Sequence, residues 1–363
     1  VRLEQRGVLD RQVEGLPPTA EMSQFKQDGR TLTRPEIAIL MAWTKIVLFD
    51  DLVASSVPDD PYFQHTLQSY FPVALKRYSD VMQVHRLKRE IISTVLANRI
   101  IDIAGPVFML RLREQTGATN ASIVEAFEAA YALLDAGALR SSIDQLDNQV
   151  PAARQLALHA SLSGSLARYT HGLLGLGESG SIVQIITALA PNADALSALQ
   201  IDALPAYLKA VMQRRAKHLS RDGVPAQLAD QIVCSALVAD APLMRRLSQE
   251  SNAAPDQVTA AYITIGNTLS LDRLRAAAEQ AIADMPYWDR LATRGLTRAL
   301  AGLQGEATKL ALQAETISAW SSENESARTD LLQDLKKYTG SRPNFAQFAL
   351  ATDAVRKFVQ AAS

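Results

Sequence analysis

Glycines 175, 177 and 180 in the segment GLGESG have the G-x-G-x-x-G spacing of a dinucleotide-binding loop. That loop works because a strand delivers the glycines to a helix N-terminus, whose free N–H groups hold the pyrophosphate. Here the preceding segment, SLARYTHGLL, has helical spacing. No second strand is predicted to carry the acidic residue that the loop needs about twenty positions later. We therefore interpret GLGESG as a linker.

The segment FDDL at residues 49–52 is similar to the aspartate-rich metal motif of all-α prenyl-diphosphate enzymes. In that motif a third carboxylate lies one helical turn beyond the first pair, so that all of them face one Mg²⁺ cluster. Position 54, where the third carboxylate would stand, is Ala54. The pattern favours the end of a helix followed by a turn. An all-α enzyme acting on diphosphates stays open as an alternative, and it would need a carboxylate-lined cavity.

The other candidate ligands are scattered. The 5 histidines never lie three or four positions apart, and Cys234 is the single cysteine, so a zinc site has no local support. HRLKRE at residues 85–90 is a basic patch that includes Glu90, which favours a solvated helix face over an anion site. No nucleophile motif or Walker sequence is present. We assign no catalytic, cofactor-binding or metal-binding residue.

The elements that would position any site are predicted to be helices. Thr33 and Glu36 form a T-x-x-E capping box, and Pro35 lies in the first turn that follows it. Apolar and polar residues nowhere alternate between Asn-Gly or Asp-Gly turns, as they would in hairpins. The sequence therefore predicts an all-α fold, a multi-helix bundle array. Further helix starts are predicted at Pro61, Asn192, Ala241 and Pro255, and helix ends at Gly117, Gly223 and Gly340.

The first predicted helix begins near residue 31 and is apolar nearly all round, which is typical of a helix surrounded by others. Its apolar run from Ile37 to Phe49 contains Lys45 and is shorter than the roughly 18–20 residues that a membrane span needs. Residues 1–30 are polar and turn-rich, lack the apolar stretch of a secretory signal and begin at Val1. We interpret them as a lead-in from an upstream domain of which this chain is a continuation.

An internal similarity organises the helical array. Residues 112–157 and 247–292, aligned without gaps at an offset of 135, share identical residues that include Pro151 and Pro286. Each proline is predicted to open a helix at the same place in its copy. We predict two related helical halves, at 31–175 and 205–363, with a connector at 176–204. Whether the similarity reflects a duplication is left open at this point.

Charge and composition exclude some partners. The chain has 37 basic and 38 acidic residues, a formal net charge of −1, so it has no bulk attraction for nucleic acid or an anionic membrane surface. With 48% apolar and 21% charged residues in 363, it is long enough to bury a large core. A single cysteine suits a reducing compartment. We expect a cytoplasmic protein with no nucleic-acid partner and no membrane partner.

Three longer segments point to a known family. They are LTRPEIAILMAWTKIVLFDDLVASSVPDDPYFQHTLQSYFP, HRLKREIISTVLANRIIDIAGPVFMLRLREQTGA and the shorter DNQVP, followed later by GVPAQLA and by the stretch from AAYITIG to LDRLRAAA. Over about residues 1–300 the chain resembles the C-terminal region of the large bacterial NAD-specific glutamate dehydrogenases. The block from LTRPE to PDDPY is the most specific part of this resemblance.

The resemblance implies a function for the parent enzyme. Members of that family interconvert L-glutamate and 2-oxoglutarate plus ammonia, with NAD as the hydride carrier, and their catalytic and Rossmann-type domains lie upstream. Hydride transfer needs close alignment of substrate and nicotinamide, and no residue of such a site can be mapped onto this sequence. We therefore expect no cofactor and no hydride transfer in this segment alone. NAD would bind to the upstream catalytic domain.

The expected role of this segment is to contact other parts of the parent enzyme. The segment would present surfaces to its own catalytic domain and to neighbouring subunits of a homo-oligomer, and it would bias domain closure. The residues predicted to line a contact surface are Trp43, Arg86, Arg89 and Trp320, because large aromatic and arginine side chains contribute most when they are desolvated. For Trp43 the alternative is simple core packing, and for the arginines it is solvation. A free-standing α-helical scaffold that binds another protein is the alternative function.

Overall fold

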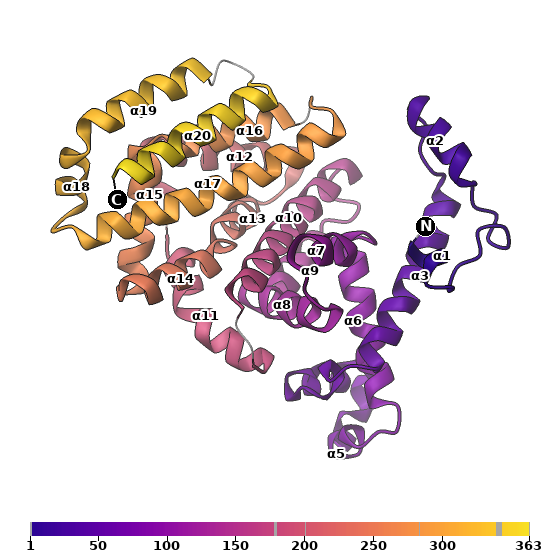
Figure 1. Ribbon diagram of the computed structural model, residues 1–363. Helices are drawn as coiled ribbons and strands as arrows, with labels where there is room; N and C mark the ends of the chain where they lie inside the picture. Colours follow the sequence, from indigo (N-terminus) through magenta and orange to yellow (C-terminus); the bar gives the residue numbers. More distant parts are fainter. Residues whose placement is uncertain (1, 178–179, 200, 283, 339–342, 363) are drawn as a thin grey trace. The chain divides into compact units, whose positions relative to one another are not determined.

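The computed structural model describes residues 2–177, 180–199, 201–282, 284–338 and 343–362 (Figure 1). Those residues form 20 α-helices, five 3₁₀ turns and no strand, which confirms the all-α array. The chain divides into two compact units, Val1–Gly137 with Leu162–Thr187, and Ala138–Ser161 with Ala188–Ser363. The boundaries predicted from the sequence, at residues 30, 175 and 204, stay a prediction.

The helices follow one another with short connections. The first unit contains α1 (Arg2–Gln5), α2 (Thr19–Gln27), α3 (Arg34–Val53), η1 (Val57–Asp59), η2 (Pro61–Phe63), α4 (Gln64–Tyr70), η3 (Val73–Tyr78), α5 (Ser79–Gln83), α6 (Lys88–Ala104), α7 (Phe108–Thr116) and α8 (Asn120–Leu133). Helices with residues in both units are α9 (Ala136–Asp144), α10 (Ala152–Leu176) and α11 (Ile182–Ser197). The second unit contains η4 (Ile201–Ala203), α12 (Ala206–Leu219), η5 (Arg221–Gly223), α13 (Ala226–Val238), α14 (Ala241–Ser251), α15 (Pro255–Thr268), α16 (Leu271–Ile282), α17 (Tyr287–Gln313), α18 (Ile317–Glu323), α19 (Glu325–Tyr338) and α20 (Phe345–Ala361).

Several helix ends lie where the sequence predicts them. Glu36 accepts hydrogen bonds from the backbone N–H of Thr33, at 2.5 Å, and from its hydroxyl, at 2.7 Å, which completes the capping box before α3. Gly117 ends α7 in the left-handed conformation. Helices also begin at Pro61, Ala241 and Pro255, as predicted. The end predicted at Gly340 lies outside the described residues.

The helix start predicted at Asn192 is wrong. Pro191 lies inside α11, which begins ten residues earlier at Ile182. A proline inside a helix removes one main-chain hydrogen bond. Buried apolar side chains continue at helical spacing on both sides of it, at Ile185, Leu189 and Ala193, and this packing outweighs the lost bond.

Helix α3 is less enclosed than its sequence predicts. Its buried residues, Val47, Leu48 and Leu52, all lie in its C-terminal half, which packs against α6 and α8. Ile37 and Ile46 remain 41% and 46% exposed. An all-round apolar helix is expected to be buried, so among the described residues the prediction that α3 is surrounded is wrong.

Each unit has its own apolar core. In the first, Leu52 of α3, Leu67 of α4 and Leu96 of α6 are fully buried, together with Phe63. In the second, α17 packs between α15 and α20, and α20 also packs against α19 (Figure 1). That core includes the large side chains of Trp320 and Phe348. These cores hold the surfaces described below in place.

The offset of 135 residues seen in the sequence is repeated by the backbone. Helix α8 and helix α15 have the same length and start and end 135 residues apart. The same distance of 135 residues separates the first residues of three further helix pairs: α9 and α16, α10 and α17, and α11 and α18. It also separates the last residues of α7 and α14. The predicted helix openings after Pro151 and Pro286 are confirmed. We call α6–α11 the first copy and α13–α18 the second copy.

Rare backbone conformations obey the same offset. Asp135 and Ser270 both have a positive φ, of 46° and 55°, in the turns before α9 and α16. Gly117 and Asn252 both end their helices in the left-handed region. Because positive φ is uncommon for residues other than glycine, two such matches at one offset are hard to obtain by chance. The two copies therefore share one local fold, as a duplication requires.

Candidate contact surface

An N-terminal strap, residues 2–18, lies against the exposed half of α3. The indole Nε1 of Trp43 donates a hydrogen bond to Glu14 at 2.9 Å, and Leu9 of the strap is buried at 6% exposure. Trp43 is itself half-buried. This side chain, predicted to lie in a contact surface or in the core, thus holds the strap to α3. Its predicted role in contact with another chain stays a prediction.

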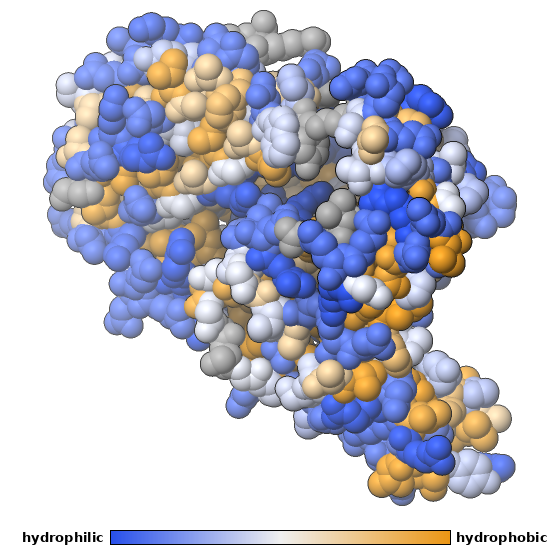
Figure 2. Space-filling view, turned by 45° about the vertical axis from the view of Figure 1, so that its right-hand side comes forward, coloured by the Kyte–Doolittle hydropathy of each residue, from blue (hydrophilic) through white to orange (hydrophobic). Residues whose placement is uncertain are grey.

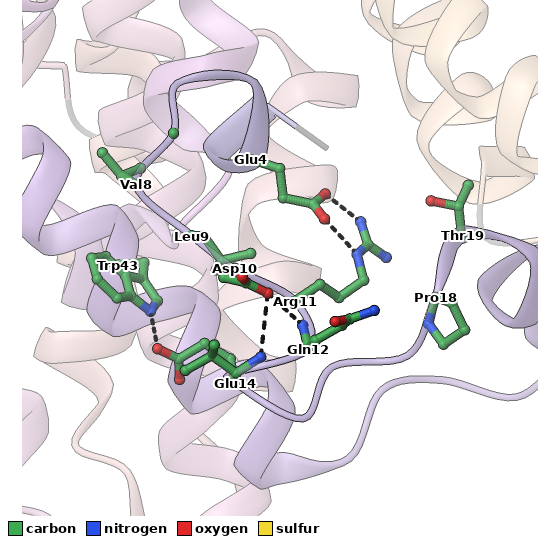
Figure 3. Close-up of a pocket in the computed structure, with 12 residues that line it drawn as sticks. Glu4, Val8, Leu9, Asp10, Arg11, Gln12, Glu14, Pro18, Thr19 and Trp43 are labelled. Carbon is green, nitrogen blue, oxygen red and sulfur yellow. Dashed lines mark hydrogen bonds and ion pairs between the residues drawn. The ribbon is translucent and has the colours of Figure 1, made fainter.

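The strap is folded back on itself by one ion pair. Arg11 donates to both carboxylate oxygens of Glu4, at 2.8 and 2.6 Å, and to the carbonyl of Pro17 at 2.7 Å. The Arg11 guanidinium lowers the pKa of Glu4 to about 2. These groups and Trp43 line an open pocket of about 720 Å³ (Figure 3). Glu4 and Arg11 pair with each other, Asp10 accepts from backbone N–H groups of the strap, and Glu14 accepts from Trp43 of α3.

Asp51, from the FDDL segment, joins three elements. Arg6 of the strap donates to both of its oxygens, at 2.9 and 3.3 Å, and Asn120 at the start of α8 donates to it at 2.5 Å. The segment lies in the last turns of α3, as the helix-end interpretation predicts. Asp51 therefore acts as a structural bridge among the strap, α3 and α8.

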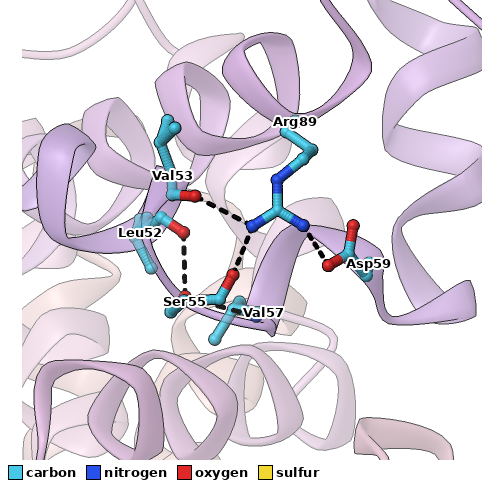
Figure 4. A network of polar contacts seen from close by, with 6 residues as sticks. All are labelled: Leu52, Val53, Ser55, Val57, Asp59 and Arg89. Carbon is cyan, nitrogen blue, oxygen red and sulfur yellow. Dashed lines mark hydrogen bonds and ion pairs between the residues drawn. The ribbon is translucent and has the colours of Figure 1, made fainter.

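Arg89 caps the C-terminal end of α3 (Figure 4). Its guanidinium donates to the carbonyls of Val53 and Ser55, at 2.8 and 2.6 Å, and pairs with Asp59. Carbonyls at a helix end lack partners within the helix, so a cation there satisfies them. Arg86, three residues earlier, is exposed. The solvated helix face predicted for HRLKRE is wrong for residues 85–87, which form a turn before α6.

A charge pair is buried between α6 and α8. Arg99 binds Glu128, whose side chain is fully buried, and the Arg99 guanidinium lies 4.9 Å from the centre of the Tyr131 ring. Burial raises the pKa of Glu128 to about 7, although Arg99 opposes this shift. Oxygen Oε1 of Glu128 has no hydrogen-bond partner. Sequence reasoning missed this pair, because nothing in the local pattern marks the two residues as neighbours.

Residues 70–87 form an exposed apolar surface, which we call the 70–87 surface. Of the fifteen large apolar side chains that are exposed in the described residues, seven lie here: Tyr70, Val73, Leu75, Tyr78, Val81, Val84 and Leu87. Apolar patches appear at the bottom of the molecule in Figure 2, the end at which α5 lies in Figure 1. Sequence reasoning identified only the basic part, at 85–90. The signal it missed was the density of apolar residues in a segment with no sustained helical period.

In the second unit, Trp320 lies in the core rather than on the surface. It is 4% exposed, and its ring meets that of Phe358 edge-on at 6.0 Å. Trp320 is therefore a core residue of its own unit. Trp43 and Arg89 belong to internal contacts of the first unit, and Arg86 is exposed beside the 70–87 surface.

The second unit also holds a buried polar network. Gln304 of α17 is 1% exposed; it donates to the carbonyl of Tyr262 at 2.6 Å and accepts from Arg275 at 2.5 Å. Arg275 also contacts Asp272, at 3.3 Å. An open pocket of about 470 Å³ lies elsewhere on this unit, and its Lys309 is paired with Glu250 at 3.2 Å. Neither arrangement presents an unpaired nucleophile.

The remaining sequence motifs give no reactive centre. A helix, α10, leads into GLGESG and ends at Leu176, although residues 178–179 of that motif lie outside the described residues. The described residues hold no group of three or more His, Cys, Asp or Glu side chains placed to bind a metal ion. Burial raises the pKa of the Cys234 thiol. These observations assign no chemistry to the chain.

The helices were also compared with what a membrane span requires. In the described part of the chain, no single helix is both long and apolar enough to cross a membrane. Helices α6 and α7 reach that length and composition only together, and they are bent by 86° where they join.

Comparison with known proteins gives a consistent result. The chain is 30% identical to an NAD-specific glutamate dehydrogenase of Halomonas elongata, over 99% of its own length and 23% of that protein's. It is 32% identical to the NAD-specific glutamate dehydrogenase of Pseudomonas aeruginosa, over 74% of this chain and 17% of that protein. For the one from Mycobacterium tuberculosis the values are 30%, 63% and 14%.

The chain thus spans less than a quarter of the length of the curated relatives that it matches. The family model described as "Glutamate dehydrogenase, C-terminal" matches residues 29–357, which is most of the chain. On this match, the chain belongs to the family of glutamate dehydrogenase C-terminal regions.

Proposed function

We propose that this chain is the C-terminal helical domain of a large NAD-dependent glutamate dehydrogenase that oxidatively deaminates L-glutamate. In that reaction glutamate, NAD⁺ and water give 2-oxoglutarate, ammonium, NADH and a proton. The observation that carries the proposal is the family match over residues 29–357, together with relatives that are named NAD-specific glutamate dehydrogenases. NAD and substrate would bind in the part of the enzyme outside these residues.

The role of the domain itself would be contact and regulation. Several of its charged side chains form hydrogen bonds or ion pairs within the domain. Arg89 caps α3, Asp51 bridges three elements, and Arg99 pairs with Glu128. Exposed apolar side chains lie on α3 and on residues 70–87. A domain of this kind influences a distant reaction by making contacts that differ between open and closed states. We propose that it contacts its own catalytic domain and neighbouring subunits of a homo-oligomer in the cytoplasm.

Deleting residues 31–363 from the complete enzyme tests this role. We expect the truncated enzyme to change its oligomeric mass, measured by light scattering, or its kcat and KM for glutamate and NAD. Supplying residues 31–363 as a separate chain is the matched control, and it should restore part of the lost property. An enzyme with unchanged mass and unchanged kinetics would contradict the contact role. A complete enzyme that does not oxidise glutamate would contradict the assignment itself.

A further inference from the structure

The 70–87 surface combines apolar exposure with positive charge. Its seven exposed apolar side chains include Val73 at 76% and Val84 at 80% exposure. Lys76, Arg77 and Arg86 are exposed among them, and Asp80 is the only exposed acid from 70 to 87. The whole chain, by contrast, has a net charge of −1. This is therefore a local concentration of cations around an apolar patch, and patches of this kind mark interaction sites.

The local structure explains why this surface needs a partner. No residue of η3 is buried, and Met82 is the buried residue of α5. Helical pieces this short are marginal in water and are ordinarily held by packing of an apolar face. Here most of the apolar side chains point away from the core of their own unit. An external surface would supply the packing that the described residues do not.

Charge argues against a second copy of the same surface as the occupant. In a two-fold contact the same patch lies on both sides, so the three cations of one copy would meet the three of the other. Like charges brought together across an interface oppose association. A complementary occupant must be acidic as well as apolar.

Shape argues against a lipid surface. Helices that lie on membranes are continuous and amphipathic, with an apolar face that enters the headgroup region. This surface consists instead of a six-residue 3₁₀ segment, a five-residue helix and the turns beside them. Its valines and tyrosines are better suited to the pockets of a protein partner, where aromatic side chains are enriched.

We propose that the 70–87 surface docks an acidic, apolar surface of the enzyme polypeptide outside residues 1–363. The inference rests on the proposed function, because it needs a larger parent enzyme. The matched region is 23% of the Halomonas relative, so most of that polypeptide is available to supply the partner surface. Arg86, predicted from the sequence as a contact residue, would lie at the edge of this interface.

Photo-cross-linking in the complete enzyme tests the proposal. A benzophenone amino acid replaces Tyr78, a conservative change at a 48% exposed aromatic position, and Leu156, which is 67% exposed elsewhere, serves as the matched control site. We expect the probe at position 78 to cross-link to an acidic segment outside residues 1–363. The double substitution Lys76→Glu with Arg77→Glu should lower that yield about tenfold, whereas Arg111→Glu, at an exposed position of α7, should leave it unchanged.

Every other result overturns the proposal. A yield at position 78 no higher than at Leu156 would mean that the surface is uncovered. Cross-links between residues of two copies of 1–363 would replace the proposed partner by a second copy. Sedimentation with phosphatidylglycerol vesicles that is lost in the Lys76→Glu, Arg77→Glu enzyme would replace it by a lipid surface. Glutamate oxidation by the unsubstituted enzyme, measured in parallel, shows separately whether the proposed function holds.

Discussion

The two copies have the same helix plan and different polar interiors. Positions 99 and 128 carry Arg99 and Glu128, a buried charge pair, in the first copy. The residues 135 positions later are Cys234 and Ile263, which form no such pair. The second copy instead buries the Gln304 network, and the position equivalent to Gln304 in the first copy is Tyr169. The same arrangement of helices therefore contains different buried polar contacts in the two copies.

The difference shows that helix register, not a particular polar contact, specifies this frame. A buried ion pair loses hydration on both sides, so an apolar pair of similar volume is often as stable. The hydrogen bonding of these buried polar groups also differs between the copies. Glu128 Oε1 and the hydroxyl of Tyr169 are buried without hydrogen-bond partners, whereas both ends of the Gln304 amide are bonded. Removing a tyrosine hydroxyl should therefore have opposite effects at Tyr169 and at Tyr262.

The largest effect should come from breaking the charge pair on one side. Arg99→Met leaves the Glu128 carboxyl buried without its cation, and should lower the free energy of unfolding by about 3–5 kcal/mol. Arg99→Met combined with Glu128→Ile imitates the second copy and should cost less than about 1 kcal/mol. Urea unfolding at pH 8, followed by circular dichroism, measures both. Equal losses in the single and double variants would show that the frame does depend on this pair.

The second largest effect should be the pH dependence of stability that Glu128 of the first copy causes. Burial raises the pKa of Glu128 from 4.5 to about 7, so between these values the folded state binds a proton that the unfolded state has released. The contribution of Glu128 to stability should accordingly be fully present below pH 4.5 and fall by about 2–3 kcal/mol as the pH rises from 4.5 to 7. In Glu128→Gln this fall should disappear. Urea midpoints at pH 5 and pH 8 compare the two proteins, and parallel pH profiles would contradict the assignment.

The second copy should be sensitive at Gly266. A Cβ added there would lie 2.5 Å from Nε2 of Gln304, so the buried amide must move and give up its bonds to Tyr262 and Arg275. Alanine also gains helix propensity over glycine, so the net effect of Gly266→Ala should be to lower the free energy of unfolding by about 1–2 kcal/mol. Gly302→Ala, in α17 with open space around its Cβ, is the matched control and should stabilise by up to about 1 kcal/mol. Thermal unfolding distinguishes them, and two stabilised variants would refute the role of the network.

The smallest effect should be a gain in the first copy. Tyr169→Phe removes a buried hydroxyl that has no partner, and should stabilise by up to about 1 kcal/mol. In the second copy Tyr262→Phe removes the hydroxyl that Arg275 contacts at 3.3 Å, and should cost about 1 kcal/mol. The two changes are chemically identical, so opposite shifts in the urea midpoint would sharpen the comparison. Shifts of the same sign would contradict it.

Local signals were sufficient for much of the fold. The capping box at Thr33 and the prolines at 151 and 286 act through their nearest neighbours, so each is readable in a short window. The helix start expected at Asn192 was not found, because the apolar stripe of α11 continues through Pro191. Propensity is a weak signal, and burial that depends on distant helices outweighs it.

The candidate surface was harder to predict for the same reason. Trp320 and Arg89 are residue types that favour interfaces, yet one fills a core and the other caps a helix. Which side a side chain faces is decided by partners far away in the sequence, such as Phe358 for Trp320. The exposed valines at 73, 81 and 84 resemble core residues by type, and only the lack of a sustained helical period in their segment separates them from core positions.

The likeness of α8 and α15 has a consequence for synthesis on the ribosome. Two helices of equal length with similar apolar faces are candidates for exchanging places while the chain is still emerging, a failure known for repeat proteins. Their divergence opposes this exchange. In the place of α15, helix α8 would carry Glu128 into a copy that has Cys234 where Arg99 belongs, leaving the carboxylate without its cation. An α8 helix in that place would therefore bury an uncompensated carboxylate, which disfavours the exchanged arrangement.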